Sequence, residues 1–333
     1  MVPSMNLPLV TRKQLSAALP YLAIAALYII VIIPGPGTPL PTAIYDDGLF
    51  FRWSSSWLNG RWLGPWDELT TSKGPLHSVI AGVAWKSGLH VFAYKRLFYL
   101  CSCALFAFTA IRECRHWIRI LLFATLLLDP LQLGGAGLRN LREGTYIPLQ
   151  MIGFGLGIYS LDRLASKKLF TKDVATSIIG MAACFGLLLI TREARSLVWI
   201  ELILWLGCLG TLSARSSMNW SKRWISLLAC IAISAASMMA PLQILRMINN
   251  QAYRAPISNS LEEGYLPIFY GRLVSARIPG EKPIPRVHLS SKAIAVLIEE
   301  SDHHGGRVSA ILRQLDSGWK QPGCAIYPET CGE

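Results

Sequence analysis

Two adjacent carboxylates, Asp46 and Asp47, are the side chains of this chain best placed to do chemistry. They follow an apolar run and precede a segment rich in tryptophan and arginine, a setting typical of a membrane surface. One carboxylate could act as a general base toward an acceptor hydroxyl, and carboxylate oxygens could hold Mg or Mn against a phosphate. The structural alternative stays open, because an acidic residue before Gly-Leu-Phe-Phe can also cap a helix.

A second candidate is Lys73, which is followed by Gly74 and Pro75 and then by an apolar run. Glycine permits a close backbone approach and proline fits the first turn of a helix. A helix that begins here could receive a phosphate, with Lys73 supplying a cation. A single lysine at a membrane surface more commonly extends its charge into water, so both interpretations remain.

Two Arg-Glu dipeptides, Arg142-Glu143 and Arg192-Glu193, lie at the ends of separate apolar runs, and Arg139 precedes the first of them. Exposed ion pairs within the dipeptides would be structural only. Two similar dipeptides at the outer ends of separate spans instead indicate one cluster that lines a cavity. Glu201, about two turns into another apolar run, is expected to face the interior of a helix bundle and to pair with an arginine.

The composition excludes an ordinary soluble domain. Of 333 residues, 52% are hydrophobic and only 16% are charged. The net charge of +12 does not indicate nucleic-acid binding, because the basic residues form short clusters between apolar runs. We therefore expect an integral, multi-pass protein of the cytoplasmic membrane, without a nucleic-acid partner.

The number of membrane spans depends on one segment, residues 76–93, which contains His77, Lys86 and His90. If this segment is interfacial or re-entrant, the three later basic clusters fall on the same cytoplasmic side as the N-terminus, as the positive-inside rule favours. If it crosses, all three clusters move outside. The sequence therefore predicts an all-α polytopic membrane protein with about seven transmembrane helices plus this interfacial or re-entrant segment. The apolar runs lie at 19–34, 76–93, 97–111, 117–133, 146–161, 174–190, 197–212 and 224–245.

The same topology predicts the domain organisation. Residues 1–245 form the transmembrane domain, with residues 35–95 as its first outer loop, and residues 246–333 form a small extracytoplasmic region. Within that region Cys324 and Cys331 could form a disulfide. The closing Cys-Gly-Glu has no obvious stop signal, which leaves a truncated chain as one interpretation. This arrangement brings the acidic pair and both Arg-Glu segments to one outer face.

The order of these motifs resembles that of a known superfamily. The segments Tyr45-Asp46-Asp47, Gly60 to Pro65, Lys73-Gly74-Pro75 and Arg142-Glu143 resemble the large-loop pattern of C-fold membrane glycosyltransferases, of the protein O-mannosyltransferase and lipid A aminoarabinose transferase type. The resemblance covers about residues 15–245 and is specific in order and spacing but loose in identity. Ser72 stands where some relatives have a metal-holding glutamate.

The resemblance implies a seven-helix core and a polyprenyl-phosphate sugar donor, with a lipid, glycan or protein as acceptor. It matches Asp46 or Asp47 to the acidic loop motif, Lys73 to a loop lysine and Glu143 to the acidic residue after the third span. Glu143 would then join the acidic pair as a catalytic acid, and Arg139, Arg142 and Arg192, with Lys73, would bind and stabilise the departing phosphate. A non-catalytic transporter or assembly factor, and an inactive member of the superfamily, are the alternatives.

Overall fold

The computed structural model describes most of the chain from Arg12 to Ser260 and one further helix. The residues described are 12–35, 37, 46–67, 70–134, 138–167, 171–192, 195–215, 220–260, 263, 268, 291–303, 309 and 313. All regular structure within these residues is helical, which confirms the all-α class. Lys168, Glu193, Cys324 and Cys331 lie outside the described residues.

The chain divides into two compact units, Met1–Leu261 and Glu262–Glu333. The first unit extends beyond residue 245, the boundary expected from hydropathy, because the last helix continues to Tyr253 and is held there by the loop at residues 62–64. Trp62 Nε1 donates a hydrogen bond to Asn249 Oδ1 (2.7 Å), and the Tyr253 hydroxyl donates to the carbonyl of Gly64 (2.9 Å). The second unit contributes one described helix, α13 (Ser291–His303).

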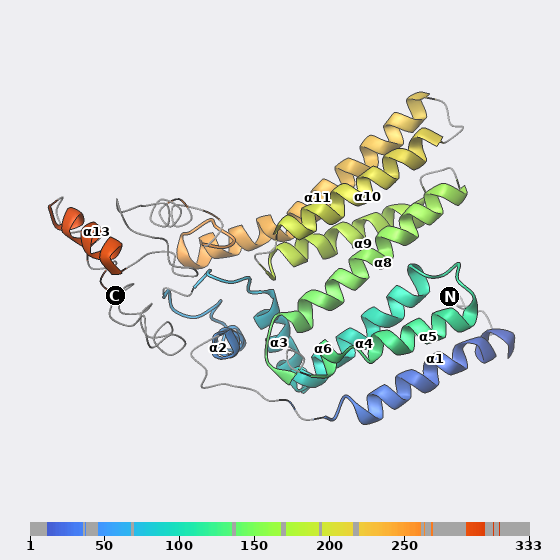
Figure 1. Ribbon diagram of the computed structural model, residues 1–333, viewed down its shortest axis with the longest axis horizontal. Helices are drawn as coiled ribbons and strands as arrows, with labels where there is room; N and C mark the ends of the chain where they lie inside the picture. The colour runs from blue at the N-terminus through green and yellow to red at the C-terminus, as the bar shows by residue number, and fades with distance from the viewer. Residues whose placement is uncertain are drawn as a thin grey trace, which may run out of the picture. The chain divides into compact units, whose positions relative to one another are not determined.

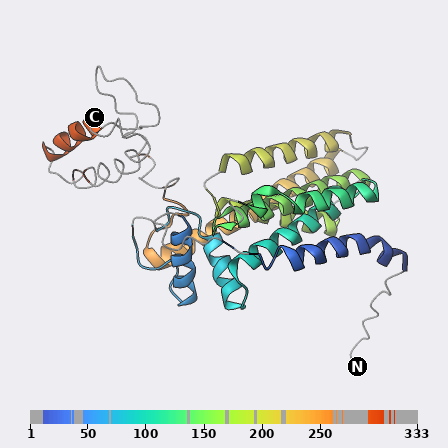
Figure 2. The same cartoon turned by 60° about the horizontal axis from the view of Figure 1, so that its bottom comes forward.

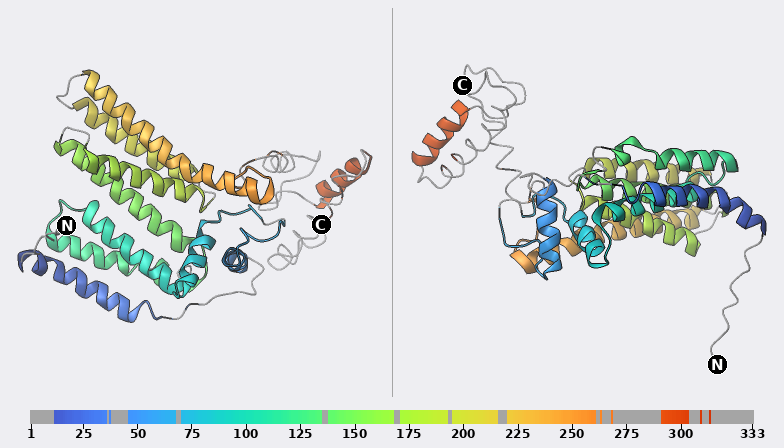
Figure 3. Two further views of the ribbon diagram at one scale, coloured as in Figure 1. Left: turned by 180° about the vertical axis from the view of Figure 1, so that it is seen from behind. Right: turned by 90° about the horizontal axis from the view of Figure 1, so that it is seen from below.

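Seven helices of the first unit form a bundle in which successive helices alternate in direction (Figure 1). Short turns connect several neighbouring pairs, and such connections favour antiparallel packing. Figure 3 shows the same helices side by side from behind. They are α1 (Arg12–Val31), α4 (Val91–Thr109), α5 (His116–Leu127), α8 (Glu143–Lys167), α9 (Lys172–Leu189), α10 (Arg195–Arg215) and α11 (Trp220–Tyr253).

Shorter helices gather at one end of this bundle. Figure 2 shows α2 (Asp46–Leu58) and α3 (Leu76–Lys86), in blue and light blue, beside the end at which α4 and α8 begin. α2 packs on α3, and α3 packs on α4. A four-residue helix, α6 (Pro130–Leu133), follows α5 at the same end.

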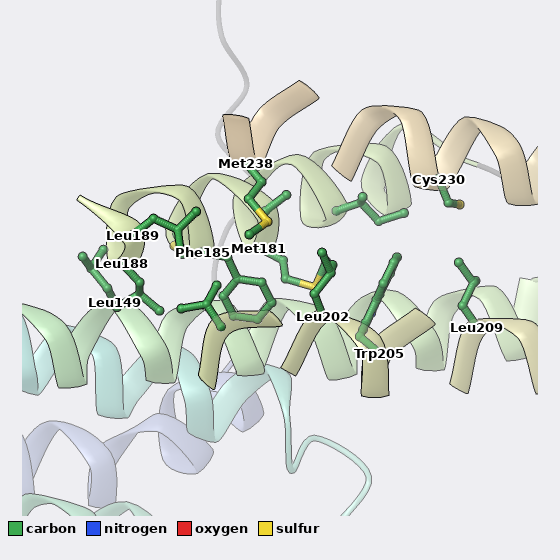
Figure 4. Packing of buried hydrophobic residues seen from close by; sticks show 14 of the residues in the cluster. Leu149, Met181, Phe185, Leu188, Leu189, Leu202, Trp205, Leu209, Cys230 and Met238 are labelled. Carbon is green, nitrogen blue, oxygen red and sulfur yellow. The ribbon is translucent and has the colours of Figure 1, made fainter. Parts of the chain in front are cut away.

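The largest core cluster lies among α8, α9, α10 and α11 (Figure 4). Met181 and Phe185 of α9 are fully buried there, against Met238 of α11 and Trp205 of α10. A Cβ atom on Gly186 would lie 2.4 Å from the carbonyl oxygen of Met238. Glycine is therefore required for α9 and α11 to approach this closely.

Four helical segments of the described chain are long and apolar enough to cross a membrane, which supports a membrane protein but is fewer than the seven expected. They are Val91–Thr109, Lys172–Leu189, Ser196–Ala214 and Trp224–Tyr253. The helices α1 and α5 are apolar but short in their described parts, and α8 has the length but contains Glu143, Gln150 and several glycines.

The segment at 76–93 is not one helix. α3 ends at Lys86, Gly88 adopts a left-handed conformation with φ +79°, and α4 begins at Val91. The 11 residues of α3 extend about 16 Å, against about 30 Å for the hydrocarbon core of a bilayer. α3 by itself is therefore too short to span.

Candidate functional site

Asp47 lies in the first turn of α2 and is completely buried. Its Oδ2 accepts a hydrogen bond from Arg139 Nη2, and its Oδ1 accepts one from the backbone N–H of Asn140 (2.8 Å). Both oxygens of Asp47 therefore hold the segment that leads into α8. Both contacts are to another segment and so do not cap α2, and complete burial leaves this carboxylate no surface for contact with an acceptor substrate.

Asp46 differs from its neighbour in exposure and in partners. Its side chain is 36% exposed, and it lies between two cations from different parts of the chain. Lys73 Nζ is 3.7 Å from Oδ1, and Arg142 Nη2 is 3.9 Å from Oδ2. These separations exceed hydrogen-bond length, so the contacts are ion pairs. Partial exposure makes Asp46 the better candidate for a general base, a choice between the two carboxylates that the sequence left open.

Lys73 reaches Asp46 from a tight turn that packs on the end of α9. Thr71 has φ +65°, a strained conformation for a β-branched residue. A Cβ atom on Gly74 would lie 2.4 Å from the carbonyl oxygen of Ile190, and the Leu76 N–H donates to that same oxygen (3.4 Å). The glycine therefore allows the Lys73 turn to pack on this backbone.

Arg142 is held on its other side by backbone and ring contacts. Its Nη1 donates to the carbonyl of Thr191 (3.5 Å), and its guanidinium lies 5.8 Å from the centre of the Phe50 ring. Only 8% of the side chain is exposed. The guanidinium thus sits at the junction of α2, α8 and the end of α9.

Arg192 of the second Arg-Glu motif lies between α9 and α10 and pairs with Glu143 of the first motif, at the start of α8. Arg192 Nη1 lies 3.2 Å from Glu143 Oε1, and the Arg192 guanidinium lies 5.8 Å from the centre of the Tyr146 ring. The structure therefore brings Asp46, Asp47, Lys73, Arg139, Arg142, Glu143 and Arg192 to one end of the bundle, as the predicted topology required.

Two buried residues of this region had no predicted role at the site. His77 Nε2 faces Asn140 Oδ1 (3.0 Å) and His77 Nδ1 faces the Thr145 hydroxyl (2.9 Å). Because a carbonyl oxygen only accepts, Nε2 carries the proton and Nδ1 accepts from Thr145. Lys95 Nζ donates to the carbonyl of Arg139 (2.6 Å). In the sequence, His77 lies inside an apolar run and Lys95 lies in the short interval between two such runs.

The surroundings of His77 keep its imidazole neutral. Complete burial, and secondarily the positive charge of Lys95, lower the pKa of His77 to about 3. The histidine is therefore a fixed hydrogen-bonding element at neutral pH and not a proton carrier.

Glu201 faces the bundle interior, as expected, but its partner is not an arginine. Gln150 Nε2 of α8 donates to Glu201 Oε1 (2.5 Å). The residue is buried between α8 and α10, where the amide contacts Oε1 without bringing a second charge into the bundle. The other oxygen, Oε2, is buried and has no hydrogen-bond partner among the described residues.

The donor set at this end of the bundle does not fit a divalent cation. Both oxygens of Asp47 are occupied, and Asp46 has a cation on each side. Among the described residues, no group of three or more His, Cys, Asp or Glu side chains could hold a metal ion. The function proposed below therefore contains no metal-dependent step.

The arrangement can instead bind an anion beside a carboxylate. Lys73 and Arg142 converge on the exposed Asp46, while Asp47 and Glu143 compensate Arg139 and Arg192. Two cations at one exposed acid suit a phosphate whose neighbouring atom reacts with a hydroxyl. No protein-family model, curated protein or solved structure was found to match this chain.

Proposed function

We propose that this protein is a glycosyltransferase that moves a sugar from a polyprenyl-phosphate donor to an acceptor hydroxyl at the membrane surface. The observation that supports this most is the position of Asp46, an exposed carboxylate between Lys73 and Arg142. The pairing places a potential base next to potential phosphate ligands. The order of the motifs along the chain, which resembles that of C-fold glycosyltransferases, supplies the donor class.

In the proposed reaction, Asp46 takes the proton of an acceptor hydroxyl as its oxygen attacks the anomeric carbon of the sugar. The bond between that carbon and the phosphate oxygen breaks, and its electron pair leaves with the lipid phosphate. Lys73 and Arg142 donate to the phosphate oxygens as negative charge accumulates there. Asp47 and Glu143 act on arginines rather than on substrate.

We further propose that the chain crosses the membrane seven times, with α5 crossing together with α6, which follows it directly, so that α2, α3 and the site lie at the extracytoplasmic surface. The four strongest spans and the alternating helix directions support this arrangement. At the opposite end of the bundle, arginines lie in the turn between α4 and α5, in the first turn of α5 and near the end of α8: Arg112, Arg115, Arg119 and Arg163. The positive-inside rule would place that end in the cytoplasm.

The test is transfer of a radiolabelled sugar from polyprenyl phosphate in membranes that contain equal amounts of each variant. Asp46→Asn keeps the side-chain shape but removes the negative charge, and we expect transfer to fall by about 10²-fold or more. Glu113→Gln is the matched control, because Glu113 is an exposed acid in the turn between α4 and α5.

Three results would contradict the proposal. Parental transfer by Asp46→Asn would remove this carboxylate from the mechanism. An equal loss in Glu113→Gln would make the effect nonspecific. Absence of transfer by the parent across a panel of polyprenyl-phosphate sugars would favour a transporter, an assembly factor or an inactive member of the superfamily.

A further inference from the structure

Three buried polar side chains from three different helices end on one two-residue segment, Arg139-Asn140. Asp47 of α2 accepts from the Arg139 guanidinium and from the Asn140 backbone N–H. His77 of α3 donates to the Asn140 side chain, and Lys95 of α4 donates to the Arg139 carbonyl. We call Asp47, His77 and Lys95 the polar brace.

Stability alone gives a poor account of the polar brace. Burying an ionised group costs several kcal/mol before its partners are counted, and apolar residues of similar volume often stabilise a fold at least as well. All three side chains are nevertheless at least 96% buried. Buried polar groups of this kind are better explained by the fixed position that they impose on their partners.

The backbone of α8 is adapted to the same contact. Lys95 passes directly over Gly144, where a Cβ atom would lie 1.9 Å from Lys95 Cε. A glycine in the first turn of a helix lowers helix stability, so its presence is consistent with a requirement for the lysine path. Thr145, next in the chain, is fully buried and completes the hydrogen bonds of His77.

Arg142 follows the braced segment after a single residue and begins the turn into α8. Its guanidinium reaches Asp46, which in turn is the neighbour of Asp47 in α2. Asp46 is therefore attached to the polar brace through α2, and Arg142 is attached to it through the Arg139-Asn140 segment.

We infer that Asp47, His77 and Lys95 are positioning residues that set the Arg142 guanidinium opposite Asp46 and so define the phosphate subsite. The inference rests on the proposed function for the identity of the ligand. Its structural part, that the brace fixes residues 139–142, stands independently of any ligand and can be measured without one.

The first measurement is amide hydrogen exchange of the purified full-length chain in lipid nanodiscs. Thr145→Val is the mild variant, because it removes only the hydroxyl that donates to His77. Asp47→Asn is the stronger one. For both we expect exchange in residues 139–142 to rise at least about tenfold, with Met181–Leu188 of the core unchanged. Arg52→Gln, an exposed change on α2, is the control and should alter neither region.

The second measurement is binding of decaprenyl phosphate to the same nanodiscs. A positioning role predicts that the dissociation constant rises about tenfold in Thr145→Val, with the number of binding sites unchanged. A purely structural role would reduce the number of sites and leave the affinity of the remainder at the parental value. The control Arg52→Gln should bind as the parent does.

The outcomes separate the inference from the proposed function. Unchanged exchange at residues 139–142 in both variants would overturn the brace itself. Increased exchange with parental affinity would overturn its positioning role. If the parent binds no decaprenyl phosphate, the proposed donor is wrong, and the role of the polar brace at a phosphate subsite is wrong as well. Increased exchange in the variants would still establish that the polar brace fixes residues 139–142.

Discussion

The guanidinium of Arg142 lies 3.9 Å from the carboxylate of Asp46, although α3, α4 and α5 lie between the two residues along the chain. This pair joins the first turn of α2 to the start of α8. The proposed phosphate subsite follows from it, because Lys73 approaches the same carboxylate from the opposite side.

Lys73 and Arg142 should each contribute to binding of a lipid phosphate. A charge-assisted contact is worth about 1.5–3 kcal/mol, so Lys73→Ala and Arg142→Ala should each weaken binding of decaprenyl phosphate by about 10- to 150-fold. Titration into nanodiscs measures the affinity, and Arg52→Ala provides an exposed cation as the control. Parental affinity in both variants would remove these residues from the subsite.

His77 should make stability depend on pH. Its pKa is about 3 in the fold, against an ordinary value of 6.5, so between these values the unfolded chain binds the proton and the folded chain does not. The contribution to stability is complete above 6.5 and is lost as the pH falls toward 3, by about 1.4 kcal/mol per pH unit.

Chemical denaturation of the parent and of His77→Gln between pH 7.5 and pH 5 tests this dependence. Glutamine can still hydrogen-bond to Asn140 and Thr145 but does not titrate, so we expect a shallower fall in the variant. Identical slopes in the two proteins would show that His77 is not the group responsible.

Gly144 should not tolerate a side chain. Gly144→Ala places a methyl group 1.9 Å from Lys95 Cε, and such overpacking typically costs about 1–3 kcal/mol. Gly207, in α10, has nothing within 4 Å of its ideal Cβ position. Gly207→Ala should therefore stabilise the chain by about 0.5–1 kcal/mol through helix propensity.

Denaturation midpoints in detergent distinguish these two glycines. The cost of Gly144→Ala should shrink in a Lys95→Ala background, because the clashing atoms are then absent. Equal effects at both glycines, or a cost that does not depend on Lys95, would contradict the proposed path of the lysine side chain.

The proposed topology predicts opposite labelling at the two ends of the bundle. Asn59 is exposed just after α2, and Glu113 is exposed in the turn between α4 and α5. With all native cysteines replaced by alanine, Asn59→Cys should react with an impermeant thiol reagent in intact cells. Glu113→Cys should react only after permeabilisation. The reverse pattern would invert the orientation, and labelling of both in intact cells would contradict the number of crossings.

The sequence by itself determined the helical class, the membrane character and the approximate location of the long helices. These properties are local, because hydropathy, helix length and the distribution of basic residues are read segment by segment. The same distribution indicated that the acidic pair and both Arg-Glu segments would meet at one end. The described chain has four clear spans where the sequence predicted about seven, because the apolar parts of α1 and α5 are short and α8 contains Glu143, Gln150 and several glycines.

Only the tertiary structure decided which carboxylate is exposed and which arginine each acid pairs with. Asp46 and Asp47 are adjacent, but consecutive residues of a helix point about 100° apart, so one can face the Arg139-Asn140 segment while the other reaches the surface. The contacts of His77 and Lys95 likewise join helices that are distant along the chain. No local pattern specifies such partners, because they exist only once α2, α3, α4 and the start of α8 are packed together.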